Sequence, residues 1–382
     1  MSHIAFEAPP APGHVNPTLP LVAELVRRGH RVSFATGERM LHAVRQAGAE
    51  PVRLPGALPV AEPGAGGESF GAEQLAVLLE GVLAEIRADL PVLVEHFGLD
   101  RPDVVCFDAI SPFGSMIAEK LGARGIALST NLVGGGTFMP ERFDFGHPRL
   151  VAVRSEMAAF AAEHGVSLPD PMAGSPAGTT IVFAPRAFQP GGDEFDEGVR
   201  FVGPSLDRHE EPFTPPGSPL LYISLGTAHT RRPEFFRTCV ASFADTPWRV
   251  VLATGAVDAG ELGAVPENFT VAPSIPQIGV LRAADVFVTH AGLGSVLEAL
   301  ALGVPTAAVP QFPEQETNAA RVRDLGLGRW LDAAELDPGS LRAAVEDVAE
   351  DADVRANLAW MRQVIAESGG AAAAADIVES RL

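Results

Sequence analysis

The hydrophobic positions of the chain follow two alternating patterns. Short, mostly apolar runs are typical of buried strands, and apolar residues spaced three and four positions apart are typical of one face of a helix. At the start of the chain these patterns predict a strand, a helix, a second strand and a second helix, in the order His3–Glu7, Leu19–Val26, Arg31–Ala35 and Glu38–Ala47. This alternation predicts a parallel sheet with helices on its faces.

The same alternation recurs along the rest of the chain. Apolar runs predict further strands at Asp103–Phe107, Gly125–Leu128, Leu220–Ser224, Trp248–Ala253, Phe269–Val271, Val286–Thr289 and Thr306–Val309. Residues 207–218 (DRHEEPFTPPGS) are charged, rich in proline and without a period, which is typical of a linker. We therefore predict an α/β fold with two doubly wound parallel-sheet domains, at 1–206 and 219–365.

Composition and charge narrow the set of partners. The chain has 382 residues, of which 47% are hydrophobic and 20% are charged, and these values are typical of a folded protein of two domains. The net charge of −20 argues against a nucleic acid or an anionic membrane surface as a partner. If the ligand is a nucleotide, a local anion-binding site must therefore hold its phosphates.

The cysteine content and the absence of targeting signals indicate a cytoplasmic protein. Cys106 and Cys239 alone do not form a disulfide framework. We find no N-terminal signal pattern and no apolar stretch long enough for a transmembrane helix. We therefore expect a soluble, cytoplasmic protein without a membrane anchor.

The segment Val288–Ala301 (VTHAGLGSVLEALA) is the strongest candidate in the sequence for a binding site. A strand ends there, a turn with two glycines follows, and a helix is predicted to begin near Ser295. Free backbone N–H groups and the positive end of the helix dipole favour a phosphate at such a turn, and His290 adds a donor. The pattern Ser295-x-x-Glu298 fits a ligand-free capping box equally well, and the spacing alone does not decide.

His14 and Asp108 each follow a predicted strand of the first domain. His14 lies in a loop before the first helix, for which we expect Asn16 as the N-cap and Pro17 in the first turn. Ligands of parallel sheets bind at the carboxyl ends of the strands. There a neutral His14 can take a proton from a hydroxyl group, and Asp108 can fix its tautomer. Each residue alone also fits an ordinary turn.

A third candidate segment is Pro310–Asn318 (PQFPEQETN), which follows a predicted strand. Its side chains Glu314, Gln315 and Glu316 suit sugar hydroxyls because carboxylates and amides together offer acceptors and donors. A solvated loop fits the same composition.

Motifs of several other enzyme classes are absent. The sequence contains no G-x-G-x-x-G after the first strand, no Walker A loop, no H-E-x-x-H, no Cys/His cluster and no G-x-S-x-G. These absences argue against a nicotinamide-dependent dehydrogenase, a P-loop NTPase, a zinc enzyme and an α/β-hydrolase.

Taken in order, the candidate segments resemble the GT-B glycosyltransferases of natural-product pathways (family 1), especially the bacterial macrolide glycosyltransferases. The resemblance covers nearly the whole chain and rests on GHVNP at 13–17, FDA at 107–109, SLGT at 224–227, IPQ at 275–277, THAGLGS at 289–295 and VPQFPEQ at 309–315. It implies two Rossmann-like domains with an interdomain cleft, and a C-terminal helix within 366–382 that packs back on the N-terminal domain.

The resemblance also implies a role for each candidate residue. His14 would be the general base and Asp108 its partner. The nucleotide-sugar donor site would be formed by Thr227, Ile275, Gln277, His290, Gly292, Gly294, Ser295, Glu298, Glu314 and Gln315. In this site the loop around His290 would hold the diphosphate, Glu298 the ribose, and Glu314 with Gln315 the transferred sugar. The reaction would be inverting, with a UDP- or TDP-sugar as co-substrate and without a metal or another cofactor.

Two positions depart from the family pattern. Many relatives carry a Trp that stacks on the base where this chain has Ser274, so the preference between uracil and thymine stays open. The sugar-binding pair is usually Asp-Gln, and the longer Glu314 of this chain leaves the identity of the sugar open.

The acceptor is expected to be a small apolar natural product, such as a macrolide or another polyketide aglycone, bound by the N-terminal domain. Two long irregular stretches, Leu54–Gly71 and Val133–His147, and the helix after Asp108 supply aromatic side chains for it. The candidates are Phe70, Phe113, Phe138, Phe143 and Phe145. Some of them fit a core position equally well, and a homodimer is compatible with the sequence.

Two other functions stay open at this point. A GT-B nucleotide-sugar epimerase would keep the diphosphate site but needs no apolar acceptor pocket. A non-catalytic sugar-nucleotide-binding helper protein would need neither His14 nor Asp108. The aromatic stretches and the presence of both polar residues favour the transferase.

Overall fold

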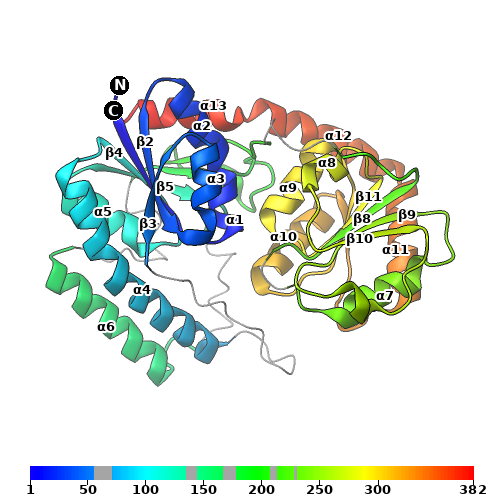
Figure 1. Cartoon of the computed structure of the whole chain (residues 1–382). Coiled ribbons are helices and arrows are strands. Elements are labelled where there is room, and N and C mark those ends of the chain that lie inside the picture. The colour runs from blue at the N-terminus through cyan, green and yellow to red at the C-terminus, as the bar shows by residue number, and fades with distance from the viewer. Residues whose placement is uncertain (56–70, 135–143, 167–177, 207–212, 228–229) are drawn as a thin grey trace. The chain divides into compact units, whose positions relative to one another are not determined.

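The chain folds into two compact units. In the computed structural model, the described residues are 1–55, 71–134, 144–166, 178–206, 213–227 and 230–382. The N-terminal unit comprises Met1–Ser205 together with Ser368–Leu382, and the C-terminal unit comprises Leu206–Glu367 (Figure 1). Half of the predicted linker, residues 207–212, lies outside the described residues.

The described part of the N-terminal unit is built on a seven-stranded parallel sheet with the order β3-β2-β1-β4-β5-β6-β7. The strands are β1 (His3–Glu7), β2 (Arg31–Gly37), β3 (Glu50–Leu54), β4 (Val104–Asp108), β5 (Arg124–Ser129), β6 (Thr180–Val182) and β7 (Val199–Phe201). The central strands β1 and β4 are buried at every position, as expected for a sheet covered on both faces. The strand order reverses between β1 and β4, so the residues that end these strands lie at the switch point of the sheet.

Helices cover both faces of this sheet. One face is covered by α1 (Pro12–Val15), α2 (Leu19–Arg27), α3 (Leu41–Gln46) and α13 (Gly370–Glu379). The other is covered by α4 (Ala72–Leu99), α5 (Pro112–Leu121) and α6 (Pro148–His164). Helix α13 packs against α2, where Arg28 Nη1 donates to Asp376 Oδ1 and to Glu379 Oε2 at 2.6 Å each. The end of the described chain therefore belongs to the N-terminal unit.

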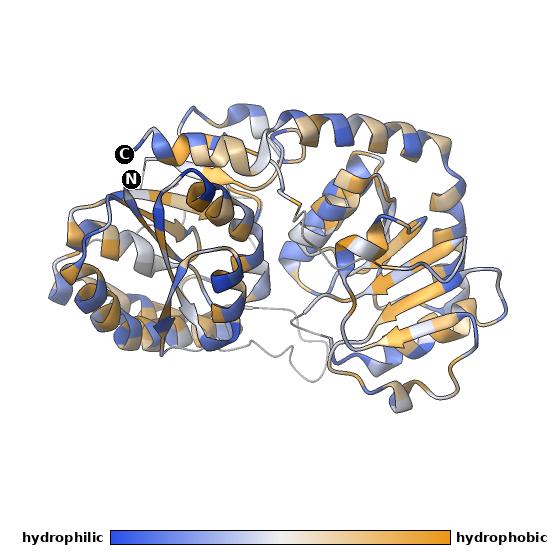
Figure 2. Cartoon of the chain, turned by 45° about the horizontal axis from the view of Figure 1, so that its top comes forward, coloured by the Kyte–Doolittle hydropathy of each residue, from blue (hydrophilic) through white to orange (hydrophobic). Residues whose placement is uncertain are grey.

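The C-terminal unit contains a six-stranded parallel sheet in its described part, with the order β10-β9-β8-β11-β12-β13. The strands are β8 (Leu220–Ser224), β9 (Arg249–Ala253), β10 (Phe269–Ala272), β11 (Val286–Thr289), β12 (Thr306–Ala308) and β13 (Gly328–Trp330). Figure 2 shows the strands of this sheet as predominantly hydrophobic. The rings of Tyr222 and Phe287 stack between β8 and β11, with centroids 4.8 Å apart.

Helices also cover both faces of the second sheet (Figure 1). Helices α7 (Pro233–Phe243) and α11 (Pro338–Glu350) pack against each other. On the opposite side, α9 (Leu293–Leu302) contacts α8 (Gln277–Leu281), α10 (Pro313–Asp324) and α12 (Ala352–Glu367). None of the described helices in either unit is long and apolar enough to cross a membrane.

One helix start differs from the prediction, and two others decide between alternatives that the sequence left open. Asn16 is not an N-cap, because the chain already turns helical at Pro12, whose fixed φ suits a first helical position. Helix α9 begins after Gly292, so Ser295 lies in its first turn and the capping box that was left open as an alternative is not formed. The segment after β12, for which a solvated loop was an open alternative, becomes helical at Pro313.

Candidate active site

His14 and Asp108 meet at the carboxyl ends of β1 and β4, which are neighbouring strands. His14 lies in the short helix α1, and Asp108 is the last residue of β4. His14 Nδ1 lies 2.8 Å from Asp108 Oδ2, and the side chains are 19% and 2% exposed, respectively. A carboxylate at Nδ1 favours the tautomer with its proton on that nitrogen, which leaves Nε2 as the proton acceptor.

Two further hydrogen bonds hold this pair. Thr130 Oγ1 lies 3.2 Å from His14 Nδ1, and the backbone N–H of Ile110 donates to Asp108 Oδ1 at 3.0 Å. Thr130 directly follows β5, the neighbour of β4. Three adjacent strand ends therefore supply the group. Thr130 was not among the predicted site residues, although its hydroxyl comes shortly after a predicted strand.

Buried carboxyl groups lie next to this pair, and the sequence analysis did not identify them. Glu7 ends β1 and is 3% exposed. Burial raises its pKa well above the usual range, a hydrogen bond from Ser111 opposes this, and the charges of Asp108, Asp89 and Glu85 raise it further. Burial therefore favours the uncharged form of Glu7 beside Asp108.

In the C-terminal unit, the turn between β11 and α9 has the geometry of an anion site. Ala291 adopts φ 65°, and Gly292 is the residue before the first helical position. The first turn of α9 therefore presents backbone N–H groups and the positive end of the helix dipole to one place.

The ring of His290 is held between two glycines. A Cβ atom on Gly226 would lie 2.5 Å from His290 Cε1, and one on Gly292 would lie 2.5 Å from His290 Nε2. No larger residue fits at either position without moving the ring. Gly226 of SLGT and Gly292 of THAGLGS are therefore required by the placement of this histidine.

Gln277 joins several of the predicted donor residues. Its Nε2 atom donates to Ser295 Oγ at 3.0 Å and to Glu298 Oε2 at 2.6 Å, and Tyr222 Oη donates to its Oε1 at 3.3 Å. The structure therefore brings Gln277, Ser295 and Glu298 together at the face of α9. The predicted ribose and phosphate residues are thus neighbours.

Glu314 and Gln315 lie in the first turn of α10 and are tied to the same region. Asn318 Nδ2 donates to Glu314 Oε1 at 2.8 Å and to the Ala291 carbonyl at 3.0 Å. The backbone N–H of Gln311 donates to Gln315 Oε1 at 2.9 Å. Sequence analysis missed Asn318, although it stands four positions after Glu314 within a segment already singled out.

For the remaining predicted residues, the structure gives at most a position in the fold and a degree of exposure. Thr227 is exposed after β8, and Ile275 is partly buried before α8. Phe145 is 38% exposed. The other acceptor candidates cannot be placed in the structure: Phe70, Phe138 and Phe143 lie outside the described residues, as does the side chain of Phe113.

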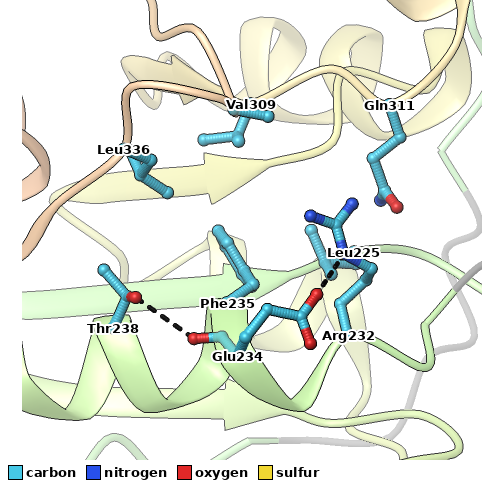
Figure 3. A pocket seen from close by; sticks show the side chains of 9 residues that line it. Leu225, Arg232, Glu234, Phe235, Thr238, Val309, Gln311 and Leu336 are labelled. Carbon is cyan, nitrogen blue, oxygen red and sulfur yellow. Dashed lines mark hydrogen bonds and ion pairs between the residues drawn. The ribbon is translucent and has the colours of Figure 1, made fainter. Parts of the chain in front are cut away.

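A cavity of about 240 Å³ lies within the C-terminal unit (Figure 3). Apolar side chains, among them Leu225, Phe235 and Val309, line it together with the polar Arg232 and Gln311. None of the predicted donor residues lines it. The backbone N–H of Gln311, which lines the cavity, donates to Gln315 Oε1 and so connects the cavity to one predicted donor residue.

Comparisons with known proteins show the family of this chain. Residues 237–379 match the family described as erythromycin biosynthesis protein CIII-like, C-terminal domain. The chain is 36% identical to the NDP-glycosyltransferase YjiC of Bacillus licheniformis, over 100% of this chain and 98% of that protein. It is 35% identical to the demethyllactenocin mycarosyltransferase of Streptomyces fradiae, over 100% and 87% of the two chains. The crystal structure of the glycotransferase of kitacinnamycin has a TM-score of 0.87 and 36% identity, and the match covers 100% of this chain and 99% of that one. Because similarity in sequence and in fold extends over the whole chain, this protein belongs to the GT-B natural-product glycosyltransferases of family 1 and is a glycosyltransferase.

Proposed function

We propose that this glycosyltransferase transfers a sugar from a UDP- or TDP-sugar to a hydroxyl group of a small apolar natural product, such as a macrolide or another polyketide, with inversion at the anomeric carbon. The names of similar proteins support these substrate classes: an NDP-glycosyltransferase, a demethyllactenocin mycarosyltransferase and an oleandomycin glycosyltransferase, the last of which is 36% identical to this chain. The hydrogen bond of 2.8 Å between His14 Nδ1 and Asp108 Oδ2 carries the proposal, because a base oriented in this way can deprotonate a hydroxyl group.

In the proposed reaction, His14 Nε2 takes the proton of the acceptor hydroxyl as the oxygen attacks the anomeric carbon. The bond from that carbon to the diphosphate oxygen breaks, and the nucleoside diphosphate leaves with the electron pair. Attack from the face opposite the leaving group inverts the configuration. The negative charge of Asp108 stabilises the imidazolium that forms.

The proposed diphosphate site is the first turn of α9. Gly292, Gly294 and Ser295 offer backbone N–H groups there, and His290 and Thr227 add side-chain donors. This arrangement stabilises the leaving diphosphate through the helix dipole and hydrogen bonds, so the reaction needs no metal ion. It also explains how a chain of net charge −20 binds an anion.

The rest of the donor is assigned to neighbouring residues. Glu298, whose carboxylate accepts from Gln277 at 2.6 Å, binds the ribose hydroxyls, and the backbone of Ile275 meets the edge of the base. Glu314 and Gln315 bind the hydroxyls of the transferred sugar. Carboxylates and amides suit this task because they accept and donate hydrogen bonds at fixed angles.

Calorimetric titration with UDP and with TDP, without added metal, tests the donor site. We expect one of them to bind with a Kd on the order of micromolar, and the tighter one identifies the nucleotide for acceptor screening. The anomeric configuration of the product, read by NMR, then tests inversion. Absence of binding by either nucleotide would contradict the assignment of the α9 site.

A further inference from the structure

Asn318 lies between two parts of the proposed donor site. It is a residue of α10 and is 1% exposed. Its Nδ2 atom donates to Glu314 Oε1 at 2.8 Å and to the Ala291 carbonyl at 3.0 Å. A carboxamide nitrogen carries two hydrogens, so these two acceptors use its full donor capacity.

The Ala291 end of this contact holds a strained turn. Ala291 has φ 65°, a conformation that residues with a side chain rarely adopt and that persists only where neighbouring groups hold it. Its N–H donates to Thr289 Oγ1 at 3.2 Å, and its carbonyl accepts from Asn318. These bonds direct the chain from β11 through Gly292 into α9, where the diphosphate is proposed to bind.

The other hydrogen bond of Asn318 holds the carboxylate of Glu314. Glu314 lies one helical turn before Asn318, at the spacing that brings side chains of one helix face together. A hydrogen bond from a buried amide to a carboxylate is stronger than one between neutral groups. Asn318 therefore restricts the orientation of the group proposed to bind the transferred sugar.

We infer that Asn318 is a positioning residue of the donor site, which holds the diphosphate-binding turn at Ala291 and the sugar-binding carboxylate of Glu314 with one buried carboxamide. This inference rests on the proposed function, which assigns the diphosphate to the turn at Ala291 and the transferred sugar to Glu314. The two parts keep a fixed relation to each other, so the diphosphate and the sugar of the donor bind to a single preformed unit.

Titration of the wild type and of two variants tests this inference. The ligands are the tighter-binding of UDP and TDP, and the corresponding nucleotide-glucose. We expect Asn318→Ala to weaken the binding of both ligands about 10-fold, because two acceptors lose their donor. We expect Glu314→Ala to weaken the binding of the nucleotide sugar. Its Kd for the nucleoside diphosphate should stay within about 2-fold of the wild-type value. In the double variant, the Glu314→Ala substitution should then reduce the affinity for the nucleotide sugar by a smaller factor than it does in the wild-type protein.

Asn357→Ala is the matched control. Asn357 is an amide of the same unit, outside the proposed site, and its Nδ2 donates to the Gly326 carbonyl at 3.2 Å. The Asn357→Ala substitution should leave the affinities for both ligands unchanged, even if it lowers the melting temperature. Asn318→Asp keeps the side-chain volume if the alanine variant does not fold, and it should weaken both ligands at least as much.

Two results would overturn the inference: wild-type affinity for both ligands in the Asn318 variants, or a loss confined to the nucleotide sugar. A wild-type protein that binds neither nucleotide would contradict the proposed function itself, so the two failures are distinguishable.

Discussion

At the scale of single residues, His14 and Asp108 differ in exposure, as the proposed roles of base and partner require. Asp108 is almost fully buried and bonded through both oxygens, to His14 and to the N–H of Ile110. His14 is partly exposed, so an acceptor can reach its ring. Thr130 adds a second contact to the same nitrogen, Nδ1. The orientation of the ring is therefore fixed from the protein side.

Replacing His14 by Ala should lower turnover by ~10²–10⁴ because the proposed general base is lost. Binding of the nucleotide should change little, since the proposed donor residues all belong to the C-terminal unit. The check is kcat with a screened acceptor together with calorimetric Kd for the nucleotide. His42→Ala, which removes an exposed histidine of the same unit, is the control. Unchanged turnover in His14→Ala would remove this residue from the mechanism.

At the scale of elements, α9 and α11 begin in contrasting ways. The side chain of Asp337 caps α11 by accepting from the N–H groups of Gly339 and Ser340 at 2.7 and 2.9 Å. Helix α9 begins after Gly292, which has no side chain to cap it. Its first N–H groups are thus not consumed by a cap residue, and this is the arrangement that an anion site requires.

Gly294→Ala separates ligand binding from stability. An added Cβ meets no protein atom within 4 Å, and Ala is the better helix former by ~0.5–1 kcal/mol, so thermal stability should be unchanged or slightly raised. The methyl group would occupy the proposed approach of a phosphate, and nucleotide affinity should fall by about 10-fold or more. Gly98→Ala in α4, which has equally open surroundings, should leave affinity unchanged. If the nucleotide binds Gly294→Ala as tightly as the wild type, the phosphate does not contact this turn.

At the scale of the whole molecule, stability should depend on pH through the buried carboxyl groups of the N-terminal unit. Burial, with a smaller effect of the Asp89 charge, raises the pKa of Glu85 from 4.5 to about 7. The native state then keeps a proton that the unfolded chain has already released above its ordinary pKa. The free energy of unfolding therefore decreases as the pH rises from 4.5 through 7.

Glu85→Gln should remove this part of the pH dependence. Between about pH 5 and pH 8, the free energy of unfolding of the wild type should fall relative to the variant by on the order of 1–2 kcal/mol. Urea unfolding at several pH values measures the difference. Glu95→Gln, at an exposed position of the same helix, serves as the control. Equal slopes for Glu85→Gln and the wild type would show that Glu85 titrates normally.

Much of the fold could be predicted because a parallel sheet covered on both faces produces near-continuous apolar strands. The strands β1, β8 and β11 begin and end where the apolar runs do. Helix α4 was not predicted, since its buried face includes Glu85 and Asp89 and a proline interrupts its interior. A buried carboxyl group breaks the apolar period on which such predictions depend.

The helix starts and the site contacts could be predicted only in part. Pairing His14 with Asp108 required only that parallel strands end at one edge of a sheet. The contact of Asn318 with Ala291 joins helix α10 to the turn between β11 and α9, and no local pattern encodes it. Asn16 was misjudged because the helix-initiating role belongs to an earlier proline, at position 12.

Helix α13 bears on how the protein is synthesised. Its residues Ala374, Ala375 and Val378 are fully buried in the core that also contains Ile4, on β1. The strands of the N-terminal unit leave the ribosome early, but the part of the apolar face that α13 covers stays exposed until this helix has been translated. During that interval the C-terminal unit can fold, while the N-terminal unit carries exposed hydrophobic surface of the kind that chaperones bind. The first domain of the sequence is therefore the last to be completed.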